Sequence, residues 1–212
     1  MMADDFGSTG ESRRAAPALT DFAKELTNDL PEGAANPLPP VELWNPPFCG
    51  VIDMRIAHDG SWFYQGSPIN RPALVRLFST ILRKDPDRYV LVTPVERVGI
   101  AVEDAPFIAV EMAVAGQGPS KTLSFRTNVG DWVRVDADHP LRFDRDKAGG
   151  VKPYVLVRGG LWALVKRALT MDLIALCEYS AHEGAQSFGV ASAGAFFKLA
   201  DAQEIDAIEA NL

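Results

Sequence analysis

The stretch "VIDMRIAHDGSWFYQG", residues 51–66, decides the fold that the sequence predicts for the N-terminal half of the chain. Ile52, Met54 and Ile56 alternate with polar or small residues, which is the two-residue period of a strand with one buried face. The His-Asp-Gly sequence that follows favours a tight turn, and Trp-Phe-Tyr begins a second run of large residues. The stretch therefore predicts a β-hairpin.

The next segment, "SPINRPALVRLFSTILRK" (residues 67–84), predicts an α-helix. Asn70 is the expected N-cap, and Pro72 suits the first turn, where its missing N–H costs little. Apolar residues recur at the i, i+3, i+4, i+7 and i+8 spacing of a helix face, at Leu74, Leu77, Phe78, Ile81 and Leu82. The hairpin and this helix together predict a strand-then-helix unit.

From Tyr89 onward the pattern favours strands, with a second helix near the C-terminus. Strands are expected in "YVLVTP", "ERVGIAV", "FIAVEMAVAG", "TLSFRTN", "DWVRVDA" and "PYVLVRGG", and a last strand or two in "SFGVASAGAFFKL". The turn sequences between them suit a curved antiparallel sheet. The second helix is expected from Leu161 to about Glu178, with Leu161, Val165, Leu169, Leu173 and Leu176 on one face.

The predicted fold class is α+β, with duplicated strand-then-helix units. "RPALVRLFST" (from Arg71) and "LWALVKRALT" (from Leu161) both place Ala-Leu-Val and a basic residue early in an expected helix. An ancient duplication explains this echo, and chance similarity between amphipathic helices is the alternative. We expect a disordered tail over residues 1–16, an N-terminal α+β unit over 17–104 that begins with a short helix from about Ala18 to Leu30, and a C-terminal antiparallel β plus helix unit over 105–212, joined near Val102–Pro106.

Composition limits the functional classes. The chain has 212 residues, a net charge of −7 and a pI near 5.0, which argues against a duplex nucleic-acid surface. The sequence has no run of about 18 apolar residues and no apolar signal core, so we expect no membrane association and a cytoplasmic location. We expect no cofactor.

The sequence gives little support to catalysis. Cys49 would need a neighbouring base to become a thiolate, but Pro47, Phe48 and Gly50 surround it, so we expect a small buried hydrophobe. Trp44 and Phe48 are expected to anchor this segment on the core. The three histidines, His58, His139 and His182, are isolated, and no metal-ligand pair is apparent.

Candidate ligand-binding residues are arginines on polar strand faces, aromatic rings and glycines. Arg158, Gly159 and Gly160 of "VRGGL" would lead a strand into a helix N-terminus, which favours an anion, although an ordinary strand-to-helix turn uses the same residues. Arg126, Thr127 and Asn128 could contact a phosphate or base edge, or could equally cap a hairpin and make a surface ion pair. The remaining candidates are Arg55 and Arg71 for an anion, and Trp62 and Tyr64 for stacking, with core packing as the alternative for these two rings.

The long stretches together resemble the bacterial family catalogued as domain of unknown function 1285, from about Leu43 to Leu199. The resemblance is carried by "WNPPFCGVIDMRI" (from Trp44), "DGSWFYQGSPINRPALVRLFSTILR" (from Asp59), "LVTPVERVGIAVEDAPF" (from Leu91), "FRTNVGD" (from Phe125) and "PYVLVRGGL" (from Pro153). It implies two similar α+β units, the second superficially like a pleckstrin-homology domain. It also implies a cleft between them for a nucleotide-like ligand, and a role in signalling.

The expected function is that of a non-enzymatic, cytosolic binding or sensing protein for a small anionic, nucleotide-like ligand between its two units. The first rival is a hydrolase or redox enzyme that uses Cys49 or a histidine. The second is an adaptor with a protein partner, which a contiguous exposed apolar patch would indicate.

Overall fold

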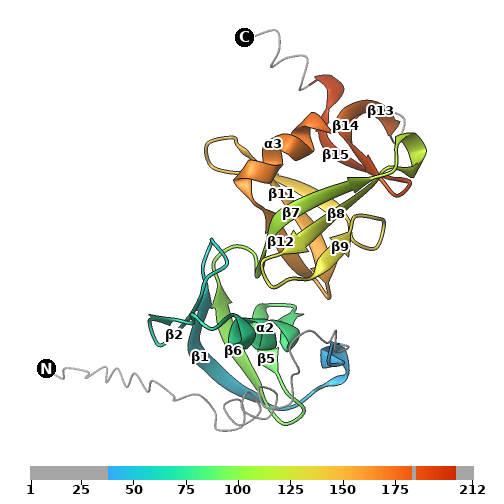
Figure 1. Cartoon of the computed structure of the whole chain (residues 1–212). Coiled ribbons are helices and arrows are strands. Elements are labelled where there is room, and N and C mark those ends of the chain that lie inside the picture. The colour runs from blue at the N-terminus through green and yellow to red at the C-terminus, as the bar shows by residue number, and fades with distance from the viewer. Residues whose placement is uncertain (1–37, 183–184, 204–212) are drawn as a thin grey trace, which may run out of the picture. The chain divides into compact units, whose positions relative to one another are not determined.

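The computed structural model describes residues 38–182 and 185–203 (Figure 1). The expected tail over residues 1–16 and the expected helix from Ala18 to Leu30 lie outside the described residues. Within them the chain forms strands β1 to β15, two α-helices, α2 and α3, and two short 3₁₀ helices, η1 and η2. The chain separates into two compact units, one of residues 38–55 and 62–101 and one that contains residues 56–61 and the chain from residue 102 onward.

The first unit contains a six-stranded sheet in the order β3-β2-β1-β6-β5-β4. Its elements are η1 (Val41–Leu43), β1 (Phe48–Ile56), β2 (Trp62–Tyr64), β3 (Ser67–Pro68), α2 (Pro72–Thr80), β4 (Leu82–Asp85), β5 (Arg88–Val92) and β6 (Arg97–Val102). The predicted hairpin is confirmed, because β1 and β2 are neighbours on either side of the His-Asp-Gly turn. The core of this unit consists of apolar residues from this hairpin, from α2 and from β4 to β6, such as Met54, Leu77, Leu91 and Val98.

The second unit contains a six-stranded sheet in the order β10-β11-β12-β7-β8-β9 and a smaller sheet in the order β13-β14-β15. Its elements are β7 (Phe107–Ala115), η2 (Gly118–Ser120), β8 (Thr122–Thr127), β9 (Trp132–Arg134), β10 (Leu141–Arg145), β11 (Val151–Arg158), β12 (Leu161–Val165), α3 (Arg167–Ala175), β13 (Glu178–His182), β14 (Ala185–Ser192) and β15 (Ala195–Asp201). Buried Ser192 joins the two sheets, because its hydroxyl donates to the carbonyl of Val135 (2.7 Å) and accepts the backbone N–H of Leu123 (2.9 Å).

The two six-stranded sheets share one strand order. Each consists of two three-stranded meanders, and in each the first strand of the sheet lies beside the last strand of that sheet: β1 beside β6, and β7 beside β12. The β7–β12 pair is parallel, with Phe107 opposite Ala163 and Ala109 opposite Val165. The feature that the two halves of the chain share is therefore the order of strands in their six-stranded sheets.

The prediction of an α+β fold with strand-then-helix units is wrong, because the described chain is mainly β. The largest error is the second helix: "LWALV" forms β12 and α3 begins only at Arg167. Leu161, Ala163 and Val165 are buried while the two residues between them are half-buried, which is the period of a strand. Comparison with a pleckstrin-homology domain also fails, because a third sheet follows α3 and the six-stranded sheet is not wholly antiparallel.

The sequence echo does not mark equivalent elements. Ala73–Val75 lie in α2, whereas the matching Ala163–Val165 lie in β12. Pro72 opens α2 as predicted, but Arg71 and not Asn70 is the N-cap residue, without a side-chain hydrogen bond. The helix also ends early, since Leu82 already belongs to β4. Strands β10 and β13 were not expected.

The helices of the described residues include none with the length and apolar character needed to cross a membrane.

Candidate functional site

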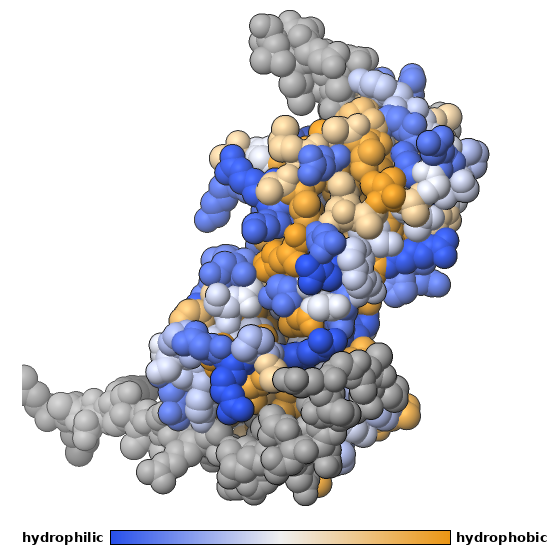
Figure 2. Space-filling model, viewed as in Figure 1, coloured by the Kyte–Doolittle hydropathy of each residue, from blue (hydrophilic) through white to orange (hydrophobic). Residues whose placement is uncertain are grey.

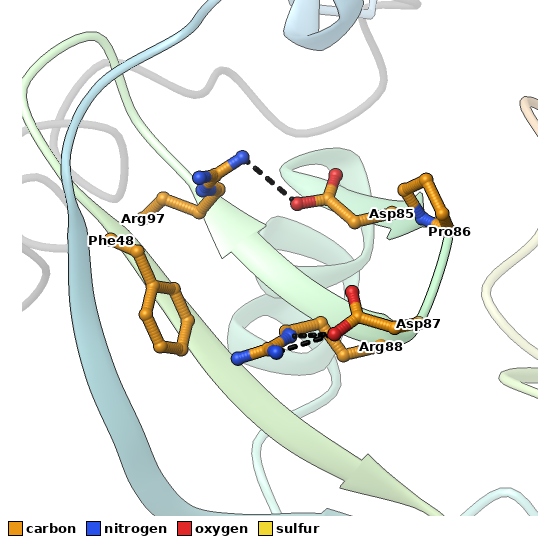
Figure 3. A pocket seen from close by; sticks show the side chains of 6 residues that line it. All are labelled: Phe48, Asp85, Pro86, Asp87, Arg88 and Arg97. Atoms are coloured by element: carbon orange, nitrogen blue, oxygen red, sulfur yellow. Dashed lines mark hydrogen bonds and ion pairs between the residues drawn. The ribbon is translucent and has the colours of Figure 1, made fainter.

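A pocket of about 330 Å³ opens on the first unit and is the candidate functional site (Figure 3). Its lining comes from the start of β1, the β4–β5 hairpin and the start of β6, and consists of Phe48, Asp85, Pro86, Asp87, Arg88 and Arg97. Asp85 pairs with Arg88 across the two-residue Pro-Asp turn of the hairpin, which presents both side chains at one end of the sheet. The pocket thus combines an aromatic ring with two carboxylates and two guanidinium groups.

The Phe48 ring forms the apolar wall of the pocket. It is 39% exposed, and the guanidinium carbons of Arg88 and Arg97 lie 4.7 and 5.9 Å from its centroid. Gly99 on β6 leaves room for the ring, since a Cβ there would sit 3.5 Å from Phe48 and 3.2 Å from Val51. The expectation that Phe48 anchors on the core is therefore wrong.

Asp85 is held on both of its oxygens. Its Oδ1 accepts from Arg83 Nε (2.8 Å) and its Oδ2 from an amino group of Arg97 (3.0 Å). Arg83 is buried, and its Nη1 donates to the carbonyl oxygens of Val41 (2.8 Å) and Trp44 (2.7 Å). Because these partners belong to the fold, Asp85 and Arg97 form a rigid side of the pocket.

Asp87 and Arg88 form the adjustable side. Arg88 donates to Asp87 Oδ2 through Nε (3.0 Å) and through a second, shorter bond. The hydrogen bond from Arg88 holds the pKa of Asp87 below its usual range. Both side chains are largely exposed, at 64% and 42%, and solvent screens such surface pairs so that they contribute little to stability. Arg88 can therefore exchange Asp87 for another anion at little cost.

The charge of this group of residues is positive. The ion pairs join three arginines, at 83, 88 and 97, to the two aspartates, which leaves one excess positive charge in a chain of net charge −7. The lining offers carboxylates and guanidinium groups, and no thiol, hydroxyl or imidazole. This set suits recognition of an anion. In the described part of the chain no group of three or more His, Cys, Asp or Glu could hold a metal ion.

The residues that the sequence singled out do not line this pocket. Trp62 is 1% exposed and stacks on Phe78 with ring centroids 6.2 Å apart, so its ring is core and unavailable to a ligand. The Arg55 guanidinium lies over the Phe63 ring at 4.3 Å. Tyr64 is half-buried on β2, and Arg71 is the exposed residue before α2.

Arg126, Thr127 and Asn128 lie together at the end of β8, each with an internal partner. Arg126 Nε donates to Glu111 across the β7–β8 ladder (2.7 Å), and buried Thr127 accepts from the backbone of Asp131 (3.1 Å). Asn128 accepts the Ile108 N–H through Oδ1 (3.0 Å) and donates to the Gly60 carbonyl (3.4 Å). These contacts match the hairpin-capping alternative.

Arg158, Gly159 and Gly160 do not precede a helix. The glycines have φ of 47° and 75° and form the turn between β11 and β12. The prediction that these residues lead into a helix N-terminus is therefore wrong. Arg158 donates to Asp131 (3.1 Å) and lies over the Phe107 ring at 5.1 Å, so the structure does bring it to the loop that follows Thr127.

Cys49 is exposed, contrary to the expectation of burial, and its thiol donates to the carbonyl oxygen of Pro47 (3.5 Å). It is on β1 but does not line the pocket. The other thiol, Cys177, donates to the Leu173 carbonyl (3.6 Å), and burial raises its pKa to about 11.

A second cluster of titratable groups lies in the second unit around Asp104. Burial would raise the pKa of Asp104, but the hydrogen bonds from Lys152 and Tyr154 outweigh it, so the pKa is lowered. Burial raises the pKa of Tyr154, which keeps it a donor. His58 lies nearby, with Nε2 3.6 Å from Glu103 and its backbone N–H donating to the same carboxylate (3.0 Å). The cluster holds the turn of residues 56–61 within this unit.

Sequence reasoning missed the pocket because its residues come from four strands. "DPDRY" signals a turn, but it directly follows the segment of residues 67–84 that predicts a helix, which hid the hairpin between two strands. The available signal was the Pro-Asp pair between "LRKD" and "RYVLV", which form the two strands on either side of a tight turn.

The fold and the site together define a mainly β protein of two units with a polar, arginine-lined pocket in the first. Family models match the chain as the "Domain of unknown function (DUF1285), N-terminal domain" over residues 39–105 and the "Protein of unknown function (DUF1285), C-terminal domain" over residues 106–199. The chain belongs to the DUF1285 family, as its sequence resemblance indicated.

Two crystal structures of family members are similar to the chain. A DUF1285 protein from Silicibacter pomeroyi DSS-3 is 52% identical, with a TM-score of 0.75 over 82% of this chain and 93% of that one. A DUF1285 protein from Shewanella baltica OS155 is 30% identical, with a TM-score of 0.48 over 57% of this chain and 90% of that one. No curated protein matches the chain.

Proposed function

We propose that this protein is a binding and sensing protein for a small anionic molecule, which occupies the Phe48 pocket of the first unit. The observation that carries the proposal is a pocket of about 330 Å³ in which a partly exposed aromatic ring lies against two guanidinium groups. Pockets for small molecules begin at about 300 Å³ and combine apolar walls with a few polar groups. The pocket therefore suits a compact ligand.

The charge pattern supports an anion. The excess positive charge at Arg83, Arg88 and Arg97 is opposite in sign to the net charge of the chain. Guanidinium groups bind carboxylates and phosphates through parallel N–H donors. Arg88 is the adjustable donor and Arg97 the rigid one.

A role without catalysis follows from the lining. Its residues provide no thiol, hydroxyl or imidazole, and Cys49 lies outside it. Both carboxylates of the lining are paired with arginines, which makes them weak nucleophiles and weak bases. We therefore propose a sensing role in signalling over a hydrolase or redox role.

Calorimetry and thermal shift measure the binding. A panel of nucleotides, cyclic dinucleotides, phosphosugars and carboxylates is tested, and an anion at about 100 times its Kd should add about 2.7 kcal/mol of stability. Arg88→Gln should abolish this gain. Arg126→Gln is the matched control, because Arg126 is 43% exposed against 42% for Arg88 and also pairs with a carboxylate.

Two results would contradict the proposal. The first is ligand-induced stabilisation that persists in Arg88→Gln. If stabilisation is lost in Arg126→Gln but not in Arg88→Gln, the ligand binds at the residues predicted from the sequence. The other is a panel without any stabilising anion.

An adaptor role is the second candidate. Leu43, Val51 and Val95 of the first unit are 81%, 65% and 67% exposed, and a partner surface would need such residues to form one contiguous apolar patch. Figure 2 shows that apolar residues on the visible face are interrupted by polar ones. A panel in which no anion stabilises the protein would favour this adaptor role.

A further inference from the structure

We infer that Arg83 is a positioning residue of the Phe48 pocket, and that it couples the pocket to the arm, the segment of residues 41–47 that leads into β1. Arg83 does not itself line the pocket. It acts through Asp85, which it shares with Arg97. The inference goes beyond the proposed function, because it concerns how the pocket is built and applies to any molecule that binds there.

The arm is joined to the pocket at both of its ends. Through Nη1, Arg83 donates to the carbonyl oxygens of Val41 (2.8 Å) and Trp44 (2.7 Å). At the other end, the Pro47 carbonyl accepts the backbone N–H of Arg97 (3.1 Å), and the residue after Pro47 is the aromatic wall of the pocket. The same contacts therefore set the position of the arm and the shape of the pocket.

Asp85 has two arginines that compete for it. Its Oδ1 accepts from Arg83 Nε (2.8 Å), and its Oδ2 accepts from Arg97 Nη1 (3.0 Å; Figure 3). Within the described residues, the Nε of Arg97 is buried and has no hydrogen-bond partner. A buried donor without an acceptor is costly, and a carboxylate that turns both oxygens to one guanidinium satisfies two donors of that group. Asp85 cannot do this for Arg97 without leaving Arg83.

The arm decides this competition in favour of Arg83. The two carbonyl oxygens of the arm hold the buried Arg83 guanidinium with its Nε directed at Asp85. If the arm moves away, Arg83 loses these acceptors and Asp85 turns both oxygens to Arg97. Arg97 then has fewer N–H donors to offer to the pocket. Asp85 is thus an element with two arrangements, and because coupling is reciprocal, a change at Asp85 must also loosen the arm.

The first test measures the arm when Asp85 is removed. The full chain is used without any ligand, and hydrogen exchange is followed by NMR at the Trp44 N–H, which is bonded to the Val41 carbonyl (3.2 Å). Asp85→Ala should speed this exchange at least about tenfold, because Arg83 loses its charged partner. Asp87→Ala is the matched control, since Asp87 belongs to the same hairpin and also pairs with a lining arginine. It should change the exchange by less than about twofold.

The Val92 N–H serves as an internal reference for the stability of the same sheet. It is bonded to the Ile81 carbonyl (2.9 Å), away from the arm. Its exchange should be the same in Asp85→Ala as in the natural chain. Equal acceleration at Trp44 and Val92 would mean a general loss of stability and would overturn the coupling.

The second test observes the competition directly, through the side-chain Nε–H signal of Arg97 in an NMR spectrum. In Arg83→Gln, Asp85 should move onto this donor, so the signal should shift downfield and exchange more slowly with solvent. Asp85→Ala added to Arg83→Gln should remove both changes. A merely structural role of Arg83 would not produce this signature.

The remaining outcomes are equally decisive. Unchanged Trp44 exchange in Asp85→Ala overturns the coupling, and this comparison does not need Arg83→Gln to fold. An unchanged Arg97 Nε–H signal in folded Arg83→Gln overturns the role of Arg83 in positioning Asp85. Neither result bears on anion binding, which the ligand panel tests separately, so this inference and the proposed function fail independently.

Discussion

At the scale of single residues, Gly60 is the position where a side chain is least tolerable in the turn of residues 56–61. Its φ is +81°, and a Cβ there would lie 2.7 Å from both Asn128 Nδ2 and Ile108 Cγ1. The same neighbours are fixed by hydrogen bonds, because Asn128 Oδ1 accepts the Ile108 N–H and Nδ2 donates to the Gly60 carbonyl. The turn therefore depends on glycine for both its backbone conformation and its close packing.

Gly60→Ala should lower the free energy of unfolding of the second unit by about 2 to 4 kcal/mol, the sum of left-handed strain and a packing conflict. Gly149→Ala is the control, since Gly149 has a φ of +82° but nothing within 4 Å of an added Cβ. Gly149→Ala should lower the free energy of unfolding by only about 1 kcal/mol. Urea unfolding followed by circular dichroism makes the comparison, and equal losses would show that packing at Gly60 is unimportant.

Asp104 gives a prediction about pH. Its folded-state pKa is lowered by Lys152 and Tyr154 despite burial, so the stability that it contributes is present above its unfolded pKa of about 3.9. That stability is lost as the pH falls through the lower folded-state pKa. Asp104→Asn should cost about 1.5 to 3 kcal/mol at pH 7, the usual value of hydrogen bonds to a charged group. The difference from the natural chain should shrink as the pH falls below about 4.

Urea unfolding at a series of pH values measures this difference. Asp138→Asn, at an exposed loop position, is the control and should cost less than about 0.5 kcal/mol. A cost for Asp104→Asn that stays constant down to the acid limit would contradict the prediction.

At the scale of elements, residues 157–161 decide between a helix start and a hairpin. Gly159 and Gly160 both have positive φ, the combination found in type I′ hairpin turns, where Asn-Gly is the preferred pair. Gly159→Asn should therefore leave stability unchanged or raise it by up to about 1 kcal/mol. Gly160→Val should lower it by more than about 1 kcal/mol, because a β-branched residue is strained at positive φ.

Thermal unfolding of the two variants tests the hairpin. A large loss for Gly159→Asn, or no loss for Gly160→Val, would mean that the β11–β12 turn does not have this conformation in solution.

Elements with one clear period could be predicted from the sequence, and those with two could not. The hairpin, α2 and the strands from Tyr89 to Trp132 have one dominant pattern each, although their ends shift by a few residues. Leu161 and Val165 fit both the four-residue spacing of a helix and the two-residue alternation of a strand with Ala163. This segment forms a strand because β12 pairs with both β11 and β7. The spacing of apolar residues in the sequence does not show that pairing.

The pocket illustrates the same limit for the site. Phe48, Asp85, Arg88 and Arg97 begin or end four strands, and only the register of the first sheet brings them together. The arginines chosen from the sequence lay instead on strands whose own neighbours satisfy them, such as Arg126 with Glu111. The sequence thus indicated that arginines would bind the ligand, but it did not indicate which arginines line a pocket.

At the scale of the whole molecule, the negative charge predicts how the chain behaves toward nucleic acid. A net charge of −7 should repel phosphate backbones, and the local positive excess at the pocket involves few residues. Fluorescence anisotropy with a short random-sequence duplex at about 150 mM salt should show a Kd weaker than about 10⁻⁴ M. Tighter binding that falls steeply with added salt would contradict this.

The shared strand order has a consequence for synthesis of the protein. In both six-stranded sheets the first strand made is a central one, and its inner partner is the last strand made, β6 for β1 and β12 for β7. While a ribosome is still producing the intervening strands, Phe107 and Ala109 of β7 face an empty position with unpaired backbone groups, although both are fully buried in the finished protein. Each six-stranded sheet thus passes through synthesis with an open, apolar edge at its centre, and the period of greatest aggregation risk ends only when the last strand of that sheet leaves the ribosome.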